Sequence, residues 1–264
     1  TMNQVSSLKL LWEQIREEAQ QVCKTEPALI KYIDATILAH QSLLSSLSFL
    51  LASKLHHESI TEYVLKDIFD DAFSSETKTQ KAILRDIKAL IDRDSACHTF
   101  LSAFLYYKGF HALQAWRATH LLWSKNRRPL ALMLQNRISV VFDVDIHPAA
   151  KIGQGVMLDH STGLVVGETA VIEDCVSILQ GVTLGGTGKE SGDRHPKVRS
   201  GVLIGPGATI LGNIEIGEGS KIIAASVVLK DVPPHSVASG VPAEIVGTTN
   251  IGSPAEIMDH GLSG

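Results

Sequence analysis

The sequence predicts an α+β protein in which an N-terminal helical domain is followed by a parallel β-helix of hexapeptide repeats with one extended loop. Three observations predict this architecture. Apolar residues recur at helical spacing through the first half of the chain, and glycine is absent there apart from Gly109. After about Asp145 an aliphatic residue recurs every six positions instead, and this period is typical of a β-helix.

Apolar residues recur at helical spacing from the start of the chain. Apolar stripes of this kind continue to about Phe142, and Pro129 is placed to open the last helix. We expect a helical domain at 1–143, a β-helix at 144–247, and a flexible tail at 248–264, where glycine, serine and charge favour disorder. The first stripe consists of Leu8, Leu11, Trp12, Ile15 and Ala19.

The six-residue period predicts that each repeat forms one short strand and one turn, and that three repeats form one triangular coil. The aliphatic residues that lead each repeat would then stack inside the coil. The alternative is a β-sandwich, but sandwich strands alternate with period two. The leading residues are Ile146, Ile152, Leu158, Val166, Ile172, Ile178, Leu184, Val198, Ile204, Ile210, Ile216, Ile222 and Val228.

Both breaks in the repeat carry charged or imidazole side chains. The spacing widens to eight residues after Leu158 and to fourteen after Leu184. Insertions leave a solenoid as external loops, often on its binding face. We therefore expect the functional site at 159–163 and in the polar loop 185–196.

Composition excludes several classes of partner. The 264 residues carry a net charge of −4, which gives no indication of a nucleic-acid or anionic-membrane partner. The three cysteines lie far apart without metal-ligand spacing, as in a reducing compartment. No signal-peptide pattern is present, and the longest apolar stretch, 43–52, is too short to span a bilayer. We expect a cytoplasmic protein without nucleic acid, membrane partner or metal.

Several short motifs occur together between about Leu105 and Gly247. They include Leu158-Asp159-His160, Gly192-Asp193-Arg194-His195-Pro196-Lys197 and Gly240-Val241-Pro242-Ala243, with further stretches at 107–112, 144–150, 166–170 and 183–189. Through these motifs the chain from about Leu105 to Gly247 resembles the bacterial and plant serine acetyltransferases.

The resemblance implies a left-handed parallel β-helix and a serine O-acetyltransferase. Such an enzyme moves the acetyl group of acetyl-CoA to the hydroxyl of L-serine, by direct transfer, in the first step of cysteine biosynthesis. The resemblance also implies a homotrimer with active sites in the clefts between subunits, and a hexamer (a dimer of trimers) joined through the helical domains.

Acetyl transfer to an alcohol needs a base for the hydroxyl proton, and His160 is the candidate. It stands at the first break and in the matching Leu158-Asp159-His160 stretch. Asp145 is expected to orient His160 and to stabilise its charged form. The alternatives are a turn histidine bonded to the backbone and a carboxylate that faces water.

The ammonium and carboxylate groups of serine need charged partners. Arg194 is the candidate carboxylate clamp, because a guanidinium binds a carboxylate through two parallel hydrogen bonds, and His195 would assist it. By the resemblance, Asp159 and Asp94 would bind the ammonium and hydroxyl groups, although Ser95 replaces the proline that usually follows this aspartate in the family. The alternative for Arg194 and His195 is a solvated loop.

Backbone amides at Gly185, Gly186 and Thr187 are candidates for contacts with CoA and for stabilising the oxyanion. By the resemblance, Lys221 and Ala224 would line the groove for the pantetheine arm. The alternative for Lys221 is an ordinary surface lysine.

Three other functions stay open. The same coil builds acetyltransferases for homoserine, sugars or antibiotics. A free amino acid, however, needs a cationic side chain and anionic side chains near the base, and the candidate residues supply them. A β-helical carbonic anhydrase would need three histidines on one zinc ion, and His147, His160 and His195 are available. The third alternative is a scaffold without catalysis.

Two further partners follow from the resemblance. L-Cysteine is expected to inhibit at the serine site, where its thiolate would pair with protonated His160; a separate pocket in the helical half is the alternative. Members of the family bind O-acetylserine sulfhydrylase through a C-terminal isoleucine. This sequence ends Gly261-Leu262-Ser263-Gly264, so we expect weak or absent complex formation.

Overall fold

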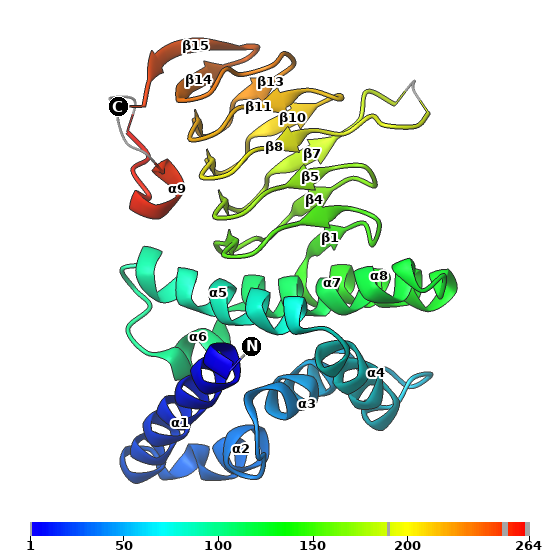
Figure 1. Cartoon of the computed structure of the whole chain (residues 1–264), viewed down its shortest axis with the longest axis vertical. Helices are drawn as coiled ribbons and strands as arrows, with labels where there is room; N and C mark the ends of the chain where they lie inside the picture. The colour runs from blue at the N-terminus through cyan, green and yellow to red at the C-terminus, as the bar shows by residue number, and fades with distance from the viewer. Residues whose placement is uncertain (1, 189–190, 250–252, 262–264) are drawn as a thin grey trace.

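The computed structural model describes residues 2–188, 191–249 and 253–261. Helices form the N-terminal end of the molecule, and a stack of short strands rises from them toward the C-terminal end (Figure 1). The sequence-based expectation of a helical region followed by a parallel β-helix is therefore confirmed. No described helix is both long enough and apolar enough to cross a membrane.

The buried apolar residues of the helical region belong to one cluster that continues into the β-helix. Pro129 lies in the first turn of the region's last helix, as the sequence predicts. Pro27 opens a short 3₁₀ turn, Pro27–Leu29, that runs into α2 and then into a π-type turn, Asp34–Leu38. The helices are α1 (Met2–Thr25), α2 (Ile30–Ile33), α3 (Leu43–Leu55), α4 (Glu62–Ser75), α5 (Thr77–Arg93), α6 (Phe100–Tyr106), α7 (Lys108–Ser124) and α8 (Arg128–Phe142).

Three parallel sheets form the faces of the β-helix. The first face contains β1 (Val144–Ile146), β4 (Leu164–Val166), β7 (Thr183–Gly185), β10 (Thr209–Leu211) and β13 (Val227–Val228). The second contains β2 (Lys151–Ile152), β5 (Val171–Ile172), β8 (Lys197–Val198) and β11 (Glu215–Ile216). The third contains β3 (Met157–Leu158), β6 (Ser177–Ile178), β9 (Leu203–Ile204), β12 (Lys221–Ile222), β14 (Ser236–Gly240) and β15 (Ala243–Thr248), of which β15 alone pairs antiparallel.

The predicted leading residues stack in register inside these faces. On the first face the ladder pairs Ile146 with Val166 and Val166 with Leu184, and it continues through Ile210 to Val228. These five side chains are at most 3% exposed. Each coil thus places one aliphatic side chain per face on the coil below, which is why the period of six predicts the core.

Both predicted breaks leave the stack. The first forms the corner between β3 and β4, where His160 and Ser161 have φ of 52° and 54°. Non-glycine residues seldom adopt this left-handed conformation, and it often marks functional positions. The second forms the long loop between β7 and β8 that projects from the coils in Figure 1.

The stacked corners above His160 share a left-handed backbone conformation. Gly163, Gly181 and Gly207 have φ of 75°, 69° and 70°, and Ala225 continues the series at 58°. Alanine therefore occupies a left-handed position where glycine is the less strained choice.

Helix α7 reaches the β-helix through a close approach at Gly109. A Cβ atom there would collide with the carbonyl oxygen of Leu158. The missing side chain lets α7 lie directly against β3, which leads into the His160 corner. The glycine in the helical half therefore positions a predicted functional segment.

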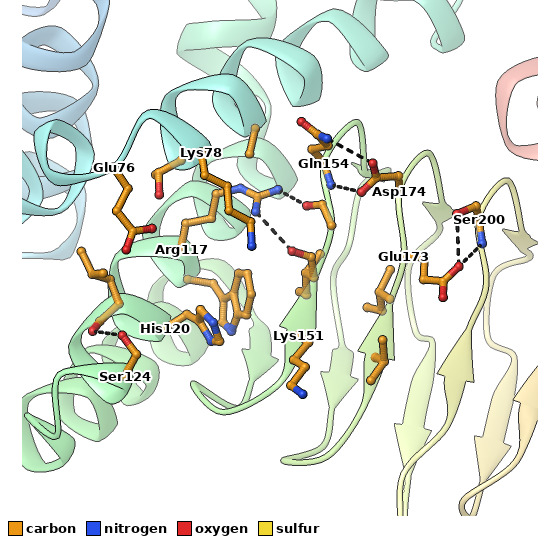
Figure 2. Close-up of a pocket in the computed structure, with 18 residues that line it drawn as sticks. Glu76, Lys78, Arg117, His120, Ser124, Lys151, Gln154, Glu173, Asp174 and Ser200 are labelled. Atoms are coloured by element: carbon orange, nitrogen blue, oxygen red, sulfur yellow. Dashed lines mark hydrogen bonds between the residues drawn. The ribbon is translucent and has the colours of Figure 1, made fainter. Parts of the chain in front are cut away.

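A buried ion pair ties the helices to the first coil. The carboxylate of Asp86 on α5 accepts hydrogen bonds from Arg117 Nε and Nη2 at 3.0 and 2.7 Å, and from the backbone N–H of Val156 at 3.1 Å. Arg117 on α7 also donates to the carbonyl of Gly153 at 2.7 Å (Figure 2). Asp86 is 1% exposed and Arg117 9%, so both charges depend on this network.

The C-terminal segment, expected to be a flexible tail, contains a short packed helix, α9 (Pro254–Ile257). Ala255 is fully buried, and its backbone bonds both to Gly201 and to the hydroxyl of Ser177. The amino-acid composition of the segment cannot predict tertiary contacts of this kind. Residues 262–264, on which the expectation about the sulfhydrylase depends, lie outside the described residues.

Candidate active site

The corner between β3 and β4 brings three predicted site residues together. Asp159 follows β3 directly, and its backbone N–H is held by the carbonyl of Ile178 in the next coil. The side chain of His160 is 75% exposed, with Nε2 3.7 Å from Asp159 Oδ1. Asp94, at the C-terminal end of α5, lies near enough to act on the charge of Asp159. The corner therefore presents an imidazole beside two carboxylates.

Local turns fix both carboxylates. The N–H of Ala96 donates to Asp94 Oδ1 at 2.8 Å, so the turn forms although Ser95 replaces the family's proline. Burial raises the pKa of the Tyr107 hydroxyl, and the neighbouring Asp94 raises it further. Burial raises the pKa of Asp159, the Asp94 carboxylate raises it further, and His160 opposes the shift. A cationic group would be favoured between these two carboxylates.

Asp145 lies apart from this cluster. Its carboxylate accepts a hydrogen bond from Gln135 Nε2 at 2.8 Å, and its backbone pairs with Val165 on β4. Within the described residues no hydrogen bond or ion pair joins Asp145 to His160. The nearest charged partner of His160 is Asp159, so the orienting role of Asp145 stays a prediction.

Arg194 and His195, at the end of the loop between β7 and β8, lie against a different corner, the turn between β4 and β5. Arg194 Nη2 pairs with Glu168 at 2.8 Å, and its Nη1 donates to the carbonyl of Gly192 at 3.0 Å. The ring of His195 packs so closely on Gly167 that a Cβ atom there would collide with it. Strand β4 separates this corner from the corner that carries His160. Within a single chain, the side chains of Arg194 and His160 are therefore apart.

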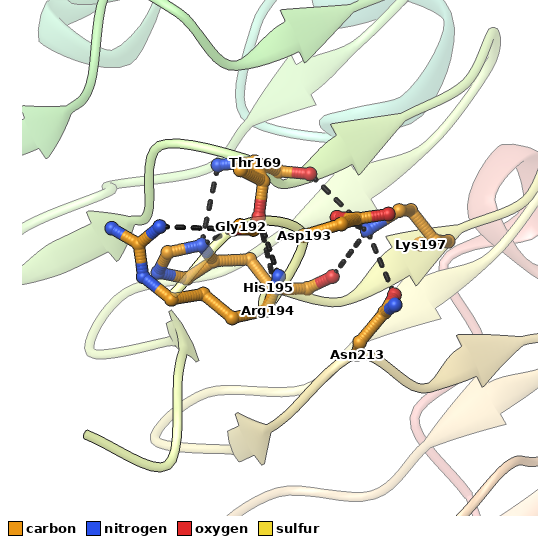
Figure 3. A network of polar contacts seen from close by, with 7 residues as sticks. All are labelled: Thr169, Gly192, Asp193, Arg194, His195, Lys197 and Asn213. Carbon is orange, nitrogen blue, oxygen red and sulfur yellow. Dashed lines mark hydrogen bonds and ion pairs between the residues drawn. The ribbon is translucent and has the colours of Figure 1, made fainter. Parts of the chain in front are cut away.

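The loop carrying Arg194 is anchored at its end rather than loosely solvated (Figure 3). Lys197 Nζ bonds to the carbonyl of Thr169 at 3.2 Å, to Asp193 Oδ1 at 2.7 Å and to Asn213 Oδ1 at 3.0 Å. Burial lowers the pKa of His195, and the charges of Arg194 and Lys197 lower it further. These influences favour the neutral form of the ring.

The predicted CoA residues divide between two places. Lys221 and Ala224 line a groove of about 190 Å³ on the third face, with Leu203, Pro206 and Ile223. His260 of the C-terminal segment also borders it, and Lys221 Nζ bonds to the carbonyl of Gly261 at 2.6 Å.

Gly185 instead ends β7, and Gly186 and Thr187 begin the long loop; of the three, Gly186 lies beside Arg194 and His195. A Cβ atom at Gly186 would lie 3.5 Å from His195 Nε2. The structure therefore groups Gly186 with the Arg194 corner and Lys221 with the third face.

A second cavity, of about 740 Å³, lies between α5, α7 and the second face. Arg117, His120 and Lys151 line it (Figure 2). None of the site residues predicted from the sequence is among its described lining residues. It is thus separate from both corners.

Among the described residues, no group of three His, Cys, Asp or Glu side chains is placed to hold a metal ion. His147 accepts a hydrogen bond from the N–H of Ala149 and packs edge-on against Trp123. His160 lies at another corner. The three histidines of the carbonic anhydrase alternative therefore do not meet within the described part of the chain.

Sequence reasoning missed Glu168, Thr169 and Lys197 as functional residues. All three lie inside stretches that match the family, at 166–170 and 192–197. Their sequence signal was therefore present, but only the tertiary structure shows that they contact Arg194 and His195.

Comparisons with known proteins agree with the fold and show the family. The family model described as serine acetyltransferase, N-terminal, matches residues 11–115. A serine acetyltransferase of Salmonella typhimurium is 53% identical over 97% of this chain and 94% of its own length.

Solved structures of the family resemble the chain along most of its length. A serine acetyltransferase in complex with cysteine aligns with a TM-score of 0.93 and 55% identity, over 95% of this chain and 98% of that one. A serine acetyltransferase of Brucella abortus in complex with coenzyme A aligns with a TM-score of 0.89 and 50% identity, over 91% and 96% of the two chains.

The β-helix, its histidine-bearing corner and these similarities define an acyltransferase enzyme. The chain belongs to the serine acetyltransferase family.

Proposed function

We propose that this enzyme transfers the acetyl group of acetyl-CoA to the hydroxyl of L-serine, with His160 as general base. The observation that carries the proposal is the His160 corner, where an exposed imidazole stands beside Asp94 and Asp159. The imidazole can take the hydroxyl proton, and the carboxylates can hold the ammonium of an amino acid. A sugar acceptor has no cation for these carboxylates to bind.

The experiment that tests this function measures release of the CoA thiol from acetyl-CoA with different acceptors. L-Serine is expected to be acetylated faster than homoserine, threonine or a sugar, because the two carboxylates and the guanidinium match a small amino acid. Faster acetylation of homoserine or of a sugar would favour the alternative acetyltransferase. No thiol release with any acceptor would favour a scaffold.

Arg194 is expected to bind the carboxylate of serine, and Arg194→Ala tests this. A charge-assisted bidentate contact contributes about 1.5–3 kcal/mol, so the serine KM should rise about 10- to 100-fold, with a much smaller change for acetyl-CoA. Arg199→Ala is the matched control, because Arg199 lies on the same coil but pairs with Glu173 and Glu215. Equal changes in both KM values would show that Arg194 is wrongly assigned.

We further propose that each active site is completed across a subunit boundary of a trimer. In one chain Arg194 and His160 stand at different corners, on either side of β4. The outward side chain of β4, Val165, is 40% exposed although apolar, and Leu229 beyond β13 is 50% exposed. A neighbouring copy that covers this face would bring its Arg194 loop toward His160, and with it Gly186.

Mixing two impaired variants tests this arrangement, if serine is kept near the wild-type KM and well below the KM of Arg194→Ala. Trimers assembled from His160→Ala and Arg194→Ala subunits should contain one intact site whenever both variants are present. Random mixing with three sites per trimer gives about a quarter of the wild-type rate. Activity no higher than that of either variant alone, in mixed trimers verified by tags, would show that each site lies within one chain.

The groove on the third face is proposed to receive the pantetheine arm of acetyl-CoA. It combines apolar walls, including Leu203 and Ile222, with the ammonium of Lys221. In this structure Lys221 is bonded to the C-terminal segment through Asp259 and Gly261. An incoming CoA would therefore exchange those contacts for its own.

L-Cysteine is proposed to inhibit at the serine site. Its ammonium and carboxylate match those of serine, and its thiol ionises far more readily than an alcohol, so a thiolate can pair with protonated His160. Saturating serine is expected to relieve the inhibition completely. If cysteine still lowers the rate at saturating serine and acetyl-CoA, and Arg194→Ala leaves its potency unchanged, a separate pocket is responsible.

The remaining sequence-based expectations stay predictions. They are the cytoplasmic location, the hexamer formed from two trimers, and the weak or absent binding to O-acetylserine sulfhydrylase. A titration against the sulfhydrylase addresses the last of these, since tight binding that depends on the tail would contradict it.

A further inference from the structure

Thr169 is the common partner of the two side chains proposed to bind the carboxylate of serine. It lies at the corner between β4 and β5, next to Glu168. Its hydroxyl oxygen accepts the backbone N–H groups of Arg194 at 3.0 Å and of His195 at 3.1 Å. Both lone pairs of the oxygen are thereby used, so one hydroxyl fixes the backbone of consecutive residues (Figure 3).

The same residue determines which nitrogen of His195 carries the proton. The backbone N–H of Thr169 donates to His195 Nδ1 at 3.2 Å, and the Thr169 hydroxyl lies 2.8 Å from the same atom. The hydroxyl proton can go to Nδ1 or to the nearby Asp193 carboxylate. Nδ1 is an acceptor in both cases, because a proton there would oppose the Thr169 N–H. A neutral ring must therefore carry its proton on Nε2.

Two further contacts orient the rest of the pair. Glu168 accepts from Arg194 Nη2 at 2.8 Å, and the guanidinium holds the pKa of this glutamate below its usual range. Lys197 Nζ donates to the carbonyls of Thr169 and His195. The loop end is thus tied to the coil on both sides of the two binding residues.

We infer that Thr169 is a positioning residue that holds Arg194 in place and fixes His195 as the Nε2–H tautomer, so that both offer donors to the carboxylate of the acceptor amino acid. This inference rests on the proposed function, in which these two side chains bind that carboxylate. His195 Nε2 has no hydrogen-bond acceptor among the described residues, and it lies beside Gly186 at the start of the loop.

The tautomer can be measured without any substrate. Histidine labelled with ¹⁵N, observed by solid-state NMR in the sedimented enzyme, distinguishes a protonated from an unprotonated ring nitrogen. The His195→Gln spectrum identifies the signals of His195. We expect Nε2 protonated and Nδ1 unprotonated at pH 7.5, and a protonated Nδ1 would overturn the inference even if serine is the substrate.

Kinetics of Thr169 variants test the positioning role. Thr169→Val keeps the shape and the N–H but removes the hydroxyl, which leaves the amides of Arg194 and His195 without their acceptor. The serine KM should rise about tenfold, with the acetyl-CoA KM within about twofold, and Thr169→Ser should restore it. Thr249→Val is the matched control, because its hydroxyl donates to Gly219 far from the loop.

Several outcomes separate this inference from the function on which it rests. A normal serine KM in Thr169→Val, or a fall in turnover with both KM values unchanged, would overturn the positioning role while serine acetylation stands. Failure of the wild-type enzyme to acetylate serine would instead remove the proposed function. The NMR measurement on the unliganded enzyme would still decide the tautomer.

Discussion

Replacing His160 by alanine is expected to lower turnover by about 10²–10⁴-fold, the range that a positioned general base contributes. The side chain is 75% exposed, and among the described residues its ring makes no hydrogen bond to the rest of the fold, so the variant should remain folded. The KM for acetyl-CoA should change little, because the imidazole acts on the hydroxyl of the acceptor. Steady-state kinetics with serine and acetyl-CoA give both numbers.

A matched control exists for this variant. His235 is also an exposed histidine at a corner of the β-helix, and its backbone is in the same left-handed conformation, with φ of 54° against 52° for His160. His235→Ala therefore carries the same backbone cost without the proposed chemistry and should keep wild-type turnover. His160→Asn, which tolerates the left-handed conformation better than alanine, separates strain from chemistry. Turnover near the wild type in a folded His160 variant would exclude this residue as the base.

The second large effect is on stability. Asp86→Ala is expected to lower the free energy of unfolding by about 3–5 kcal/mol, because it leaves the guanidinium of Arg117 buried without its partner. The N–H of Val156 and the amide of Gln114 lose their acceptor as well. Urea denaturation at fixed protein concentration measures the difference, since assembly makes stability depend on concentration.

A surface ion pair provides the comparison for Asp86. Lys66 Nζ lies 2.5 Å from Asp70 Oδ2 on α4, and the two side chains are 29% and 38% exposed. Water screens such a pair, so Asp70→Ala should cost less than about 1 kcal/mol. If Asp86→Ala costs no more than Asp70→Ala, the buried pair does not hold the helices to the first coil. The double variant Asp86→Ala with Arg117→Met should recover part of the loss, because the unpaired charge is gone.

The core of the β-helix was predictable because its period is local. Each leading residue, such as Val166 or Ile204, is specified by its distance from the previous one, and the ladders confirm the stacking. The helical stripes were predictable for the same reason. The spacing could not predict the hand of the coil, which was expected only from the resemblance.

The site was predictable in part. The widened spacing after Leu158 pointed to His160, and the motif match pointed to Asp94, Asp159 and Arg194. Their chemical types were readable from the sequence, but their partners were not. Asp145 illustrates the limit, because its carboxylate bonds to Gln135 of α8, a contact that no spacing along the β-helix indicates.

The order of helices and coils, the residues of the solenoid core and the two positions where loops leave it could be predicted from the sequence. These features follow from local periodicity and from the side chains that each period allows to be buried. Three features became evident only from the folded chain: Asp86 and Arg117 join the two regions, Thr169 organises Arg194 and His195, and the C-terminal segment lies on the third face. Such contacts join residues far apart in the chain, and their geometry depends on how complete elements pack rather than on any repeat within one of them.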